Sequence, residues 1–245
     1  MTTDKPNYRQ RIFKEYTSYS QNPKAPLDSR TIKRWEQGYD TYLKGWLPQR
    51  KDACILDVAC GSGRLLHFFK ARKYTNITGV DISPEQVQLA KKIVEAVVQA
   101  NILDFMENVD KTYDLIIGLD IIEHFQKDEV LRFLDACYKA LKPHGRLILQ
   151  LPNGESIFGA AVFSGDFTHE VHFAPTGLQR LLNLCHFCDI EIRETGPVIH
   201  GLVSAMRHVA WQVIRLIIKA WNLIETGDCG TGVFTRVFLI SAKRL

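Results

Sequence analysis

Apolar and amphipathic segments alternate along most of the chain. Residues 54–58 form a short apolar run typical of a strand, and 64–70 carry apolar side chains at helical spacing. The same alternation continues toward the C-terminus. The expected strands cover 54–58, 76–81, 96–101, 113–120, 146–153, 189–194 and 233–240. Strands that alternate with helices predict an α/β domain.

Two stretches lie outside this alternation. Residues 1–27 are polar and contain three prolines, which indicates a loosely structured arm, and Asp28 is a plausible N-cap for a helix over 28–47. A second helix, over 202–225, interrupts the strand pattern before the last strand. We therefore expect an N-terminal arm and helical cap over 1–48. The remaining domain over 49–245 then contains a helical insertion over 197–232.

The helix over 202–225 is strongly apolar but carries a regular basic stripe. Arg207, Trp211, Arg215 and Lys219 recur every four residues. Three charges inside the helix argue against a membrane span. Two alternatives stay open: a helix that covers the core or a second copy in a homodimer, or one that lies in a membrane interface.

Composition narrows the class of protein. A hydrophobic content of 46% and a charged content of 24% are ordinary for a globular enzyme, and a formal charge of +4 does not indicate nucleic acid. The first fourteen residues lack the apolar run of a secretory signal, and six scattered cysteines fit reduced thiols. We expect a cytoplasmic protein, with a peripheral position at the inner face of the membrane as the alternative that the apolar helix allows.

The turn after the first strand carries the strongest chemical signal. Gly61 and Gly63 lie between strand and helix, where backbone N–H groups approach nucleotide-like ligands. A dinucleotide fingerprint requires a third small residue where Leu66 stands, and Asp57 would repel a pyrophosphate. The same acid suits a ligand with an ammonium and a sulfonium, which describes S-adenosylmethionine (SAM).

The segment from Asp57 to Gly63 resembles the first motif of class I SAM-dependent methyltransferases, and further motifs follow in the family's order over 50–153. The resemblance implies a Rossmann-like seven-stranded sheet with SAM at the carboxyl ends of its strands. It implies that Asp81 accepts from the ribose hydroxyls and that residues 101 and 102 contact the adenine. The expected cofactor-binding residues are Asp57, Ala59, Cys60, Gly61, Gly63, Asp81, Ile82, Asn101, Ile102 and Asp120.

One position departs from the family. An acid usually stands where this chain has Asn101, whose amide oxygen can still accept from the adenine amine. Asp104 is the alternative acceptor three residues later.

Candidate catalytic groups gather in the irregular segment over 153–174, which we call the acceptor loop because a long loop after the fifth strand is typically functional. Transfer to a hydroxyl gains from a general base, and histidine suits that role. His169 is the first candidate, followed by His172, Glu170 and His124, the last in a Glu-His pair after the fourth strand. Asp166 with His169 and His172 is a weak metal pattern, and we expect no metal.

The acceptor is open to several interpretations. The acceptor loop and the segment before the last strand resemble methyltransferases of bacterial surface-polysaccharide clusters, which implies O-methylation of a sugar in O-antigen or capsule biosynthesis, with a small-molecule or glycan acceptor. The alternatives are O-methylation of a quinone or a natural-product phenol, and a non-catalytic SAM-binding module that acts on a partner. Nucleobase methylation is disfavoured, because Leu119-Asp120-Ile121-Ile122 replaces the proline-rich motif it needs.

Overall fold

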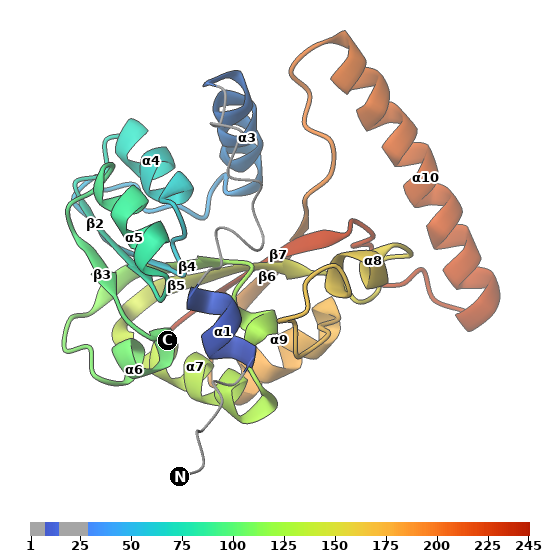
Figure 1. Ribbon diagram of the computed structural model, residues 1–245. Coiled ribbons are helices and arrows are strands. Elements are labelled where there is room, and N and C mark those ends of the chain that lie inside the picture. Colours follow the sequence, from blue (N-terminus) through green and yellow to red (C-terminus); the bar gives the residue numbers. More distant parts are fainter. Residues whose placement is uncertain (1–7, 15–28) are drawn as a thin grey trace.

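The computed structural model describes residues 8–14 and 29–245. A seven-stranded sheet with the order β3-β2-β1-β4-β5-β7-β6 forms its centre (Figure 1). The strands are β1 (Cys54–Val58), β2 (Asn76–Asp81), β3 (Val97–Gln99), β4 (Tyr113–Leu119), β5 (Leu141–Pro152), β6 (Cys188–Glu194) and β7 (Val237–Lys243). Only β7 runs antiparallel to its neighbours. The expected Rossmann-like sheet of a class I methyltransferase is confirmed.

Helices cover both faces of the sheet. They are α1 (Tyr8–Lys14), α3 (Ser29–Tyr42), α4 (Arg64–Ala71), α5 (Pro84–Lys91), α6 (Ile102–Glu107), the 3₁₀ helix η1 (Ile122–His124), α7 (Lys127–Ala140), α8 (Gly159–Phe163), α9 (Pro175–Leu184) and α10 (Leu202–Thr226). In Figure 1, α3, α4 and α5 lie on one face, and α6, α7 and α9 on the other. Two apolar clusters fill these layers, so every residue of β1 is buried. Burial on both faces explains why all of its residues except Asp57 are apolar.

The central position of β1 determines where the candidate motifs gather. It pairs with β2 on one side and with β4 on the other. Because these strands are parallel, Asp57, Asp81 and Asp120 all lie at their carboxyl edge. The strand order reverses between β1 and β4, the point where open α/β sheets bind ligands.

Several predicted boundaries were wrong for local reasons. The helix expected over 28–47 ends at Tyr42, because Gly45 turns the chain with φ of +79°, and the Asp28 cap lies outside the described residues. The turn expected before the fifth strand is a register shift within β5, whose pairing with β4 resumes at Arg146. β7 begins at Val237 instead of 233, because Asn153 Nδ2 donates to two carbonyls of the preceding segment.

The N-terminal arm is more ordered than expected. Residues 8–14 form α1, which lies against η1 and the acceptor loop, so the prediction of loose structure fails there. The proposed boundary between residues 48 and 49 stays a prediction. Tyr39 and Leu43 of the cap share an apolar cluster with Ile55 of β1.

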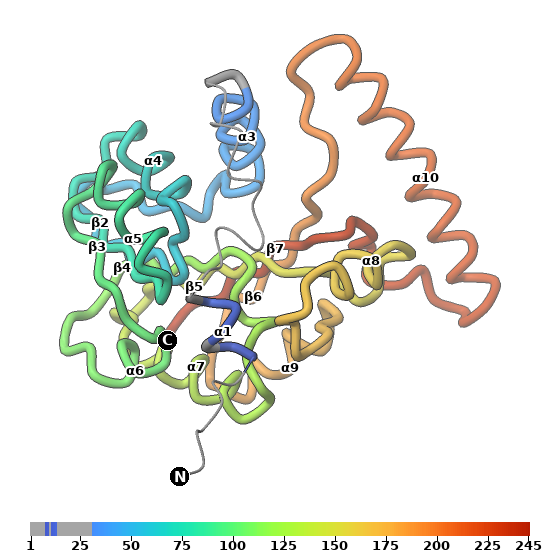
Figure 2. Tube along the Cα trace, viewed as in Figure 1, coloured from blue at the N-terminus to red at the C-terminus, as the bar shows by residue number. Residues whose placement is uncertain are grey.

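Helix α10 stands away from the rest of the molecule (Figures 1 and 2). Ser204 is its one buried residue, so the prediction that this helix covers the core is wrong. Its basic stripe faces inward, where Arg215 Nε lies 2.9 Å from Glu194. No helix in the described ranges is long and apolar enough to cross a membrane.

Candidate functional site

The glycine turn joins β1 to α4 through left-handed backbone. Ala59, Gly61 and Gly63 have φ of +57°, +53° and +88°. A Cβ at Gly63 would lie 3.1 Å from the Cα of Ala90, so this position requires glycine for close packing on α5. A Cβ at Gly61 would meet nothing nearer than 4.0 Å, which leaves this backbone approachable by a ligand.

Asp57 lies buried beneath this turn. Its Oδ2 atom accepts no hydrogen bond from any described residue. Burial, with the nearby charge of Asp81, raises the pKa of the Asp57 carboxyl well above its usual range. A buried acceptor without a donor is costly, so this carboxyl suits a ligand with cationic groups or N–H donors.

Asp81 holds the turn and the start of α5 together. Its Oδ2 accepts from the Gly61 N–H at 2.8 Å, and its Oδ1 accepts from the Ser83 N–H at 2.8 Å. Each oxygen keeps a second lone pair for the expected ribose hydroxyls. Beside it, the apolar Ile82 side chain is 43% exposed at the sheet edge, where a bound adenosyl group would cover it.

The expected adenine contact has a second role. Asn101 caps α6, and its Oδ1 accepts from the Leu103 N–H at 2.9 Å. One lone pair of the amide oxygen is therefore already used within the protein. Ile102 is buried, while Asp104 is exposed in the first turn of α6.

Asp120 ends β4 in the left-handed region, with φ of +54°. Its carboxylate accepts from Gln150 Nε2 at 3.2 and 3.3 Å, and the Tyr39 hydroxyl donates to the other end of that amide. Burial raises the pKa of Asp120. These hydrogen bonds, from Tyr39 through Gln150 to Asp120, connect α3 and β5 to the carboxyl end of β4.

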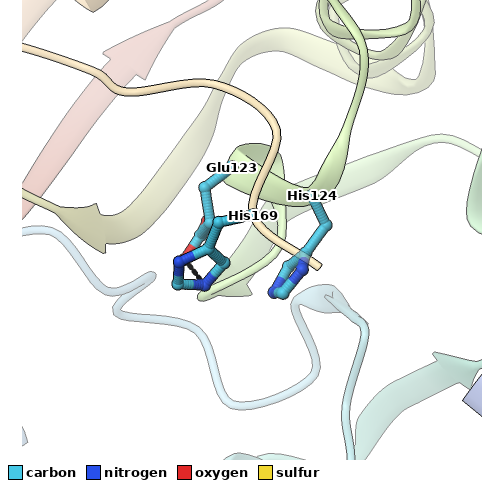
Figure 3. Close-up of side chains that lie close together, drawn as sticks. All are labelled: Glu123, His124 and His169. Atoms are coloured by element: carbon cyan, nitrogen blue, oxygen red, sulfur yellow. Dashed lines mark ion pairs between the residues drawn. The ribbon is translucent and has the colours of Figure 1, made fainter. Parts of the chain in front are cut away.

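Two of the four predicted catalytic residues, His124 and His169, meet Glu123 next to Asp120. One ligand-capable atom from each of Glu123, His124 and His169 lies within 4.8 Å of the others (Figure 3). His169 Nε2 lies 3.9 Å from Glu123 Oε1. Neither Glu123 oxygen accepts a hydrogen bond within the described part of the chain, and burial raises the pKa of this carboxyl well above its usual range.

Hydrogen bonds orient both imidazoles. His169 Nδ1 lies 2.8 Å from the Phe163 carbonyl, an acceptor only, so this nitrogen carries the proton in the neutral ring. The Thr168 hydroxyl donates to Asp166, so it accepts from His124 Nδ1 at 2.8 Å. In both neutral rings Nε2 then keeps its lone pair. Burial, together with His169, lowers the pKa of His124 to about 4.

The other two catalytic candidates point elsewhere. The Glu170 carboxylate accepts from the Tyr8 hydroxyl and lies 3.5 Å from Arg9 Nη2, so it faces α1. The His172 ring packs at a tilt against Phe163, with centroids 3.5 Å apart, and is not part of the group that Glu123 forms with His124 and His169. Both stay catalytic predictions, but the structure does not bring them to the Glu123 pair.

The sequence did not predict a role for two residues that lie beside the imidazoles, Glu123 and Arg9. Glu123 was noticed as part of a Glu-His pair, but not as a catalytic candidate. Arg9 of α1 donates to Glu129 at 2.8 Å and to the His124 carbonyl at 2.8 Å, which holds α1 beside the imidazoles. The polar arm contained no signal for this contact, because the partners lie more than 100 residues away.

Comparisons with known proteins indicate the enzyme class of the chain. Residues 55–145 match the family described as methyltransferase domain. The ubiquinone biosynthesis O-methyltransferase of Xylella fastidiosa strain 9a5c is 26% identical, over 84% of this chain and 85% of that protein. The mitochondrial enzyme of the same name from Schizosaccharomyces pombe is 23% identical, over 77% and 68%.

A solved structure agrees in fold. The SAM-dependent methyltransferase of Archaeoglobus fulgidus superposes with a TM-score of 0.64 at 23% identity, over 89% of this chain and 95% of that one. Residues 55–145 therefore form a methyltransferase domain, and the chain has the fold of the class I SAM-dependent methyltransferases.

SAM fits the residues of this methyltransferase. The unpartnered Asp57 oxygen, the open backbone at Gly61 and the exposed Ile82 lie at adjoining strand ends. When bound, SAM supplies an electrophilic methyl group on a sulfonium. Glu123 and His169 lie close to Asp120, at the carboxyl end of the neighbouring strand β4, and His124 adjoins them. Their carboxylate and two imidazoles are also a donor set that can ligate a divalent cation.

Proposed function

We propose that the methyltransferase O-methylates a hydroxyl of a small molecule of the quinone or phenol class. Two relatives that cover most of the chain are named ubiquinone biosynthesis O-methyltransferases. This similarity favours the phenol alternative over the sugar of a surface polysaccharide. The observation that carries an O-linked acceptor is the oriented His169 imidazole, whose Nε2 is free to accept a proton beside the buried Glu123.

His169 takes the hydroxyl proton in the proposed reaction. As that proton moves to Nε2, the acceptor oxygen forms its bond to the methyl carbon, and the carbon–sulfur electron pair stays with sulfur. The products are a methyl ether and S-adenosylhomocysteine. The positive charge of the imidazolium favours ionisation of the Glu123 carboxyl 3.9 Å away, and the resulting carboxylate stabilises the imidazolium. The protein otherwise positions the reactants and excludes water, which is the main requirement of an in-line displacement.

Turnover on chosen acceptors tests the proposal. The protein is incubated with SAM and either 3,4-dihydroxybenzoate or UDP-glucose, and methyl ethers are detected by mass spectrometry. Methylation of the catechol alone supports the proposal, and methylation of the sugar alone overturns the phenol assignment. Treatment with EDTA distinguishes a metal-independent general base from a reaction that needs a bound cation. If His169 acts as the base without a metal, turnover should be unchanged.

We also propose that α10 contacts a membrane surface from the cytoplasmic side. Its solvent face exposes large apolar side chains along its length, including Val209, Ile217 and Ile224. Glu225, in the last turn, is the one acid of the helix, against two arginines and a lysine. An exposed apolar face of this length suits the interfacial region of a membrane.

Vesicle sedimentation tests this contact. The intact protein should sediment with phosphatidylglycerol vesicles, and Ile217→Glu should not, while Leu184→Glu on α9 serves as the exposed apolar control. A homodimer that Ile217→Glu dissociates, without vesicle binding by the parent, would assign the face to a second copy.

A further inference from the structure

A cavity of about 590 Å³ opens at the carboxyl edge of the sheet, outside the residues assigned above. It lies between α3, the start of α10, and the segments that end β6 and begin β7. Phe158, Trp211 and Phe234 contribute aromatic surface. In open α/β sheets this edge is the ligand-binding edge, so the cavity lies where an acceptor could extend.

The polar lining of this cavity is basic. Arg34, Arg207, Arg236 and His200 line it, and none of the described residues in its wall is acidic. The three guanidinium groups form no ion pair or hydrogen bond with another described residue, and Arg236 only stacks over the Phe158 ring at 5.1 Å. In the adjoining cavity, by contrast, Arg215 is paired with Glu194 at 2.9 Å.

The N-terminus of α10 and the indole of Trp211 also favour an anion in this cavity. The cavity wall includes Ser204 in the first turn of α10; its hydroxyl already donates to the Gly201 carbonyl, so this part of the wall contributes the partial positive charge of the helix N-terminus. The indole N–H of Trp211, also in the wall, is buried and finds no acceptor among the described residues. Guanidinium forks, a helix N-terminus and a free N–H together match the oxygens of an anion.

The same elements connect this cavity to the methyl-transfer site. Gly38 and Tyr42 line the cavity from α3, and Tyr39 between them donates to Gln150, which holds Asp120. The Asn153 N–H donates to the Arg236 carbonyl at 2.8 Å, which fixes that residue to the end of β5.

We propose that this cavity, which we call the arginine subsite, binds an oxyanion of the methyl acceptor, a phosphate or a carboxylate. Arg34, Arg207 and Arg236 hold the anion, while the hydroxyl to be methylated lies toward His169. The proposal rests on the proposed O-methyltransferase function and narrows it to acceptors that carry a negative group. The aromatic wall packs against the uncharged part of the acceptor.

Binding of small anions to the whole protein tests the subsite directly. Inorganic pyrophosphate and benzoate are titrated separately by calorimetry into the parent protein, Arg207→Ala/Arg236→Ala, and the control Arg180→Ala. Arg180 is an exposed arginine on α9 outside this cavity. We expect at least about tenfold weaker anion binding in the double variant and no change in the control. Stronger binding of pyrophosphate indicates a phosphorylated acceptor, and stronger binding of benzoate a carboxylated one.

A second measurement separates this proposal from the function on which it rests. SAM affinity and the thermal midpoint verify that the double variant is folded. Steady-state kinetics with 3,4-dihydroxybenzoate should show KM raised about tenfold and kcat within about threefold. Equal anion affinities in all three proteins, or an unchanged KM with active enzyme, overturn the subsite while leaving O-methylation intact. Selective loss of anion binding in a protein that methylates no hydroxyl leaves the subsite and overturns the proposed function.

Discussion

The cofactor side and the acceptor side of the sheet edge are built in different ways. All the proposed cofactor-binding residues except Asp120 come from one continuous stretch, residues 57–102, whose turns and caps are closed by local hydrogen bonds such as Ser83 N–H to Asp81. The acceptor side joins segments that are distant in sequence, and the Tyr8–Glu170 hydrogen bond spans 162 residues. Local geometry produces a recognisable motif, whereas long-range assembly leaves only scattered polar residues along the chain.

Removal of the proposed base should give the largest effect. His169→Ala should lower turnover about 10²–10⁴-fold and leave SAM affinity nearly intact, because the imidazole lies outside the cofactor turn. His172→Ala is the comparison, since its ring packs against Phe163 and lies outside the group formed by Glu123, His124 and His169. Near-normal turnover in His169→Ala with a collapse in His124→Ala would move the base to η1.

Loss of Asp81 should act on the cofactor side alone. Asp81→Ala removes the acceptor for two backbone N–H groups and for the expected ribose hydroxyls, at about 1.5–3 kcal/mol for each bond to the charged group. SAM affinity measured by calorimetry should fall more than tenfold. Asp81→Asn keeps one side-chain oxygen and should lose less. Unchanged affinity in a folded Asp81→Ala protein would place the ribose elsewhere.

Glu123 should make stability depend on pH. Burial raises the pKa of its carboxyl in the native state, so the native protein keeps a proton that the unfolded chain loses above about pH 4.5. Native stability contributed by this group is present below that pH and is lost as pH rises toward the native pKa. Relative to the parent, Glu123→Gln should therefore gain unfolding free energy between pH 5 and 8, by at most about 1.4 kcal/mol per pH unit.

Urea unfolding at several pH values provides the measurement. Glu107→Gln is the matched control, because Glu107 is exposed and pairs with Arg132 at the surface. A constant difference between Glu123→Gln and the parent across this range would show that the native pKa is not raised.

The contact of α1 should have the smallest effect. Arg9→Ala removes a partly buried ion pair with Glu129, worth about 1 kcal/mol, and frees α1 from the His124 carbonyl. We expect acceptor KM to rise about fivefold in steady-state kinetics without a change in SAM affinity. Arg11→Ala, exposed on the same helix, should behave as the parent does. Equal kinetics in both variants would make α1 irrelevant to the acceptor.

The sequence alone determined the sheet and the cofactor edge. Buried parallel strands need continuous apolar runs, and left-handed turns need residues such as Gly63, so both leave local patterns that predict β1, α4 and β2 within a residue or so. Asn101 also acts through its sequence neighbours, because it is the N-cap of α6 and the third strand ends before it. These features depend on neighbours along the chain.

Only the tertiary structure decided the acceptor side. His169 could be nominated from its loop, but its pairing with Glu123 depends on the Glu170 N–H donating to the Glu123 carbonyl at 2.7 Å across the site. For α10, the amphipathic pattern predicted a helix with one apolar face, yet that face points to solvent while Arg215 turns inward to Glu194. The physical reason is that periodicity fixes which side chains share a face, whereas packing with distant segments decides what that face meets.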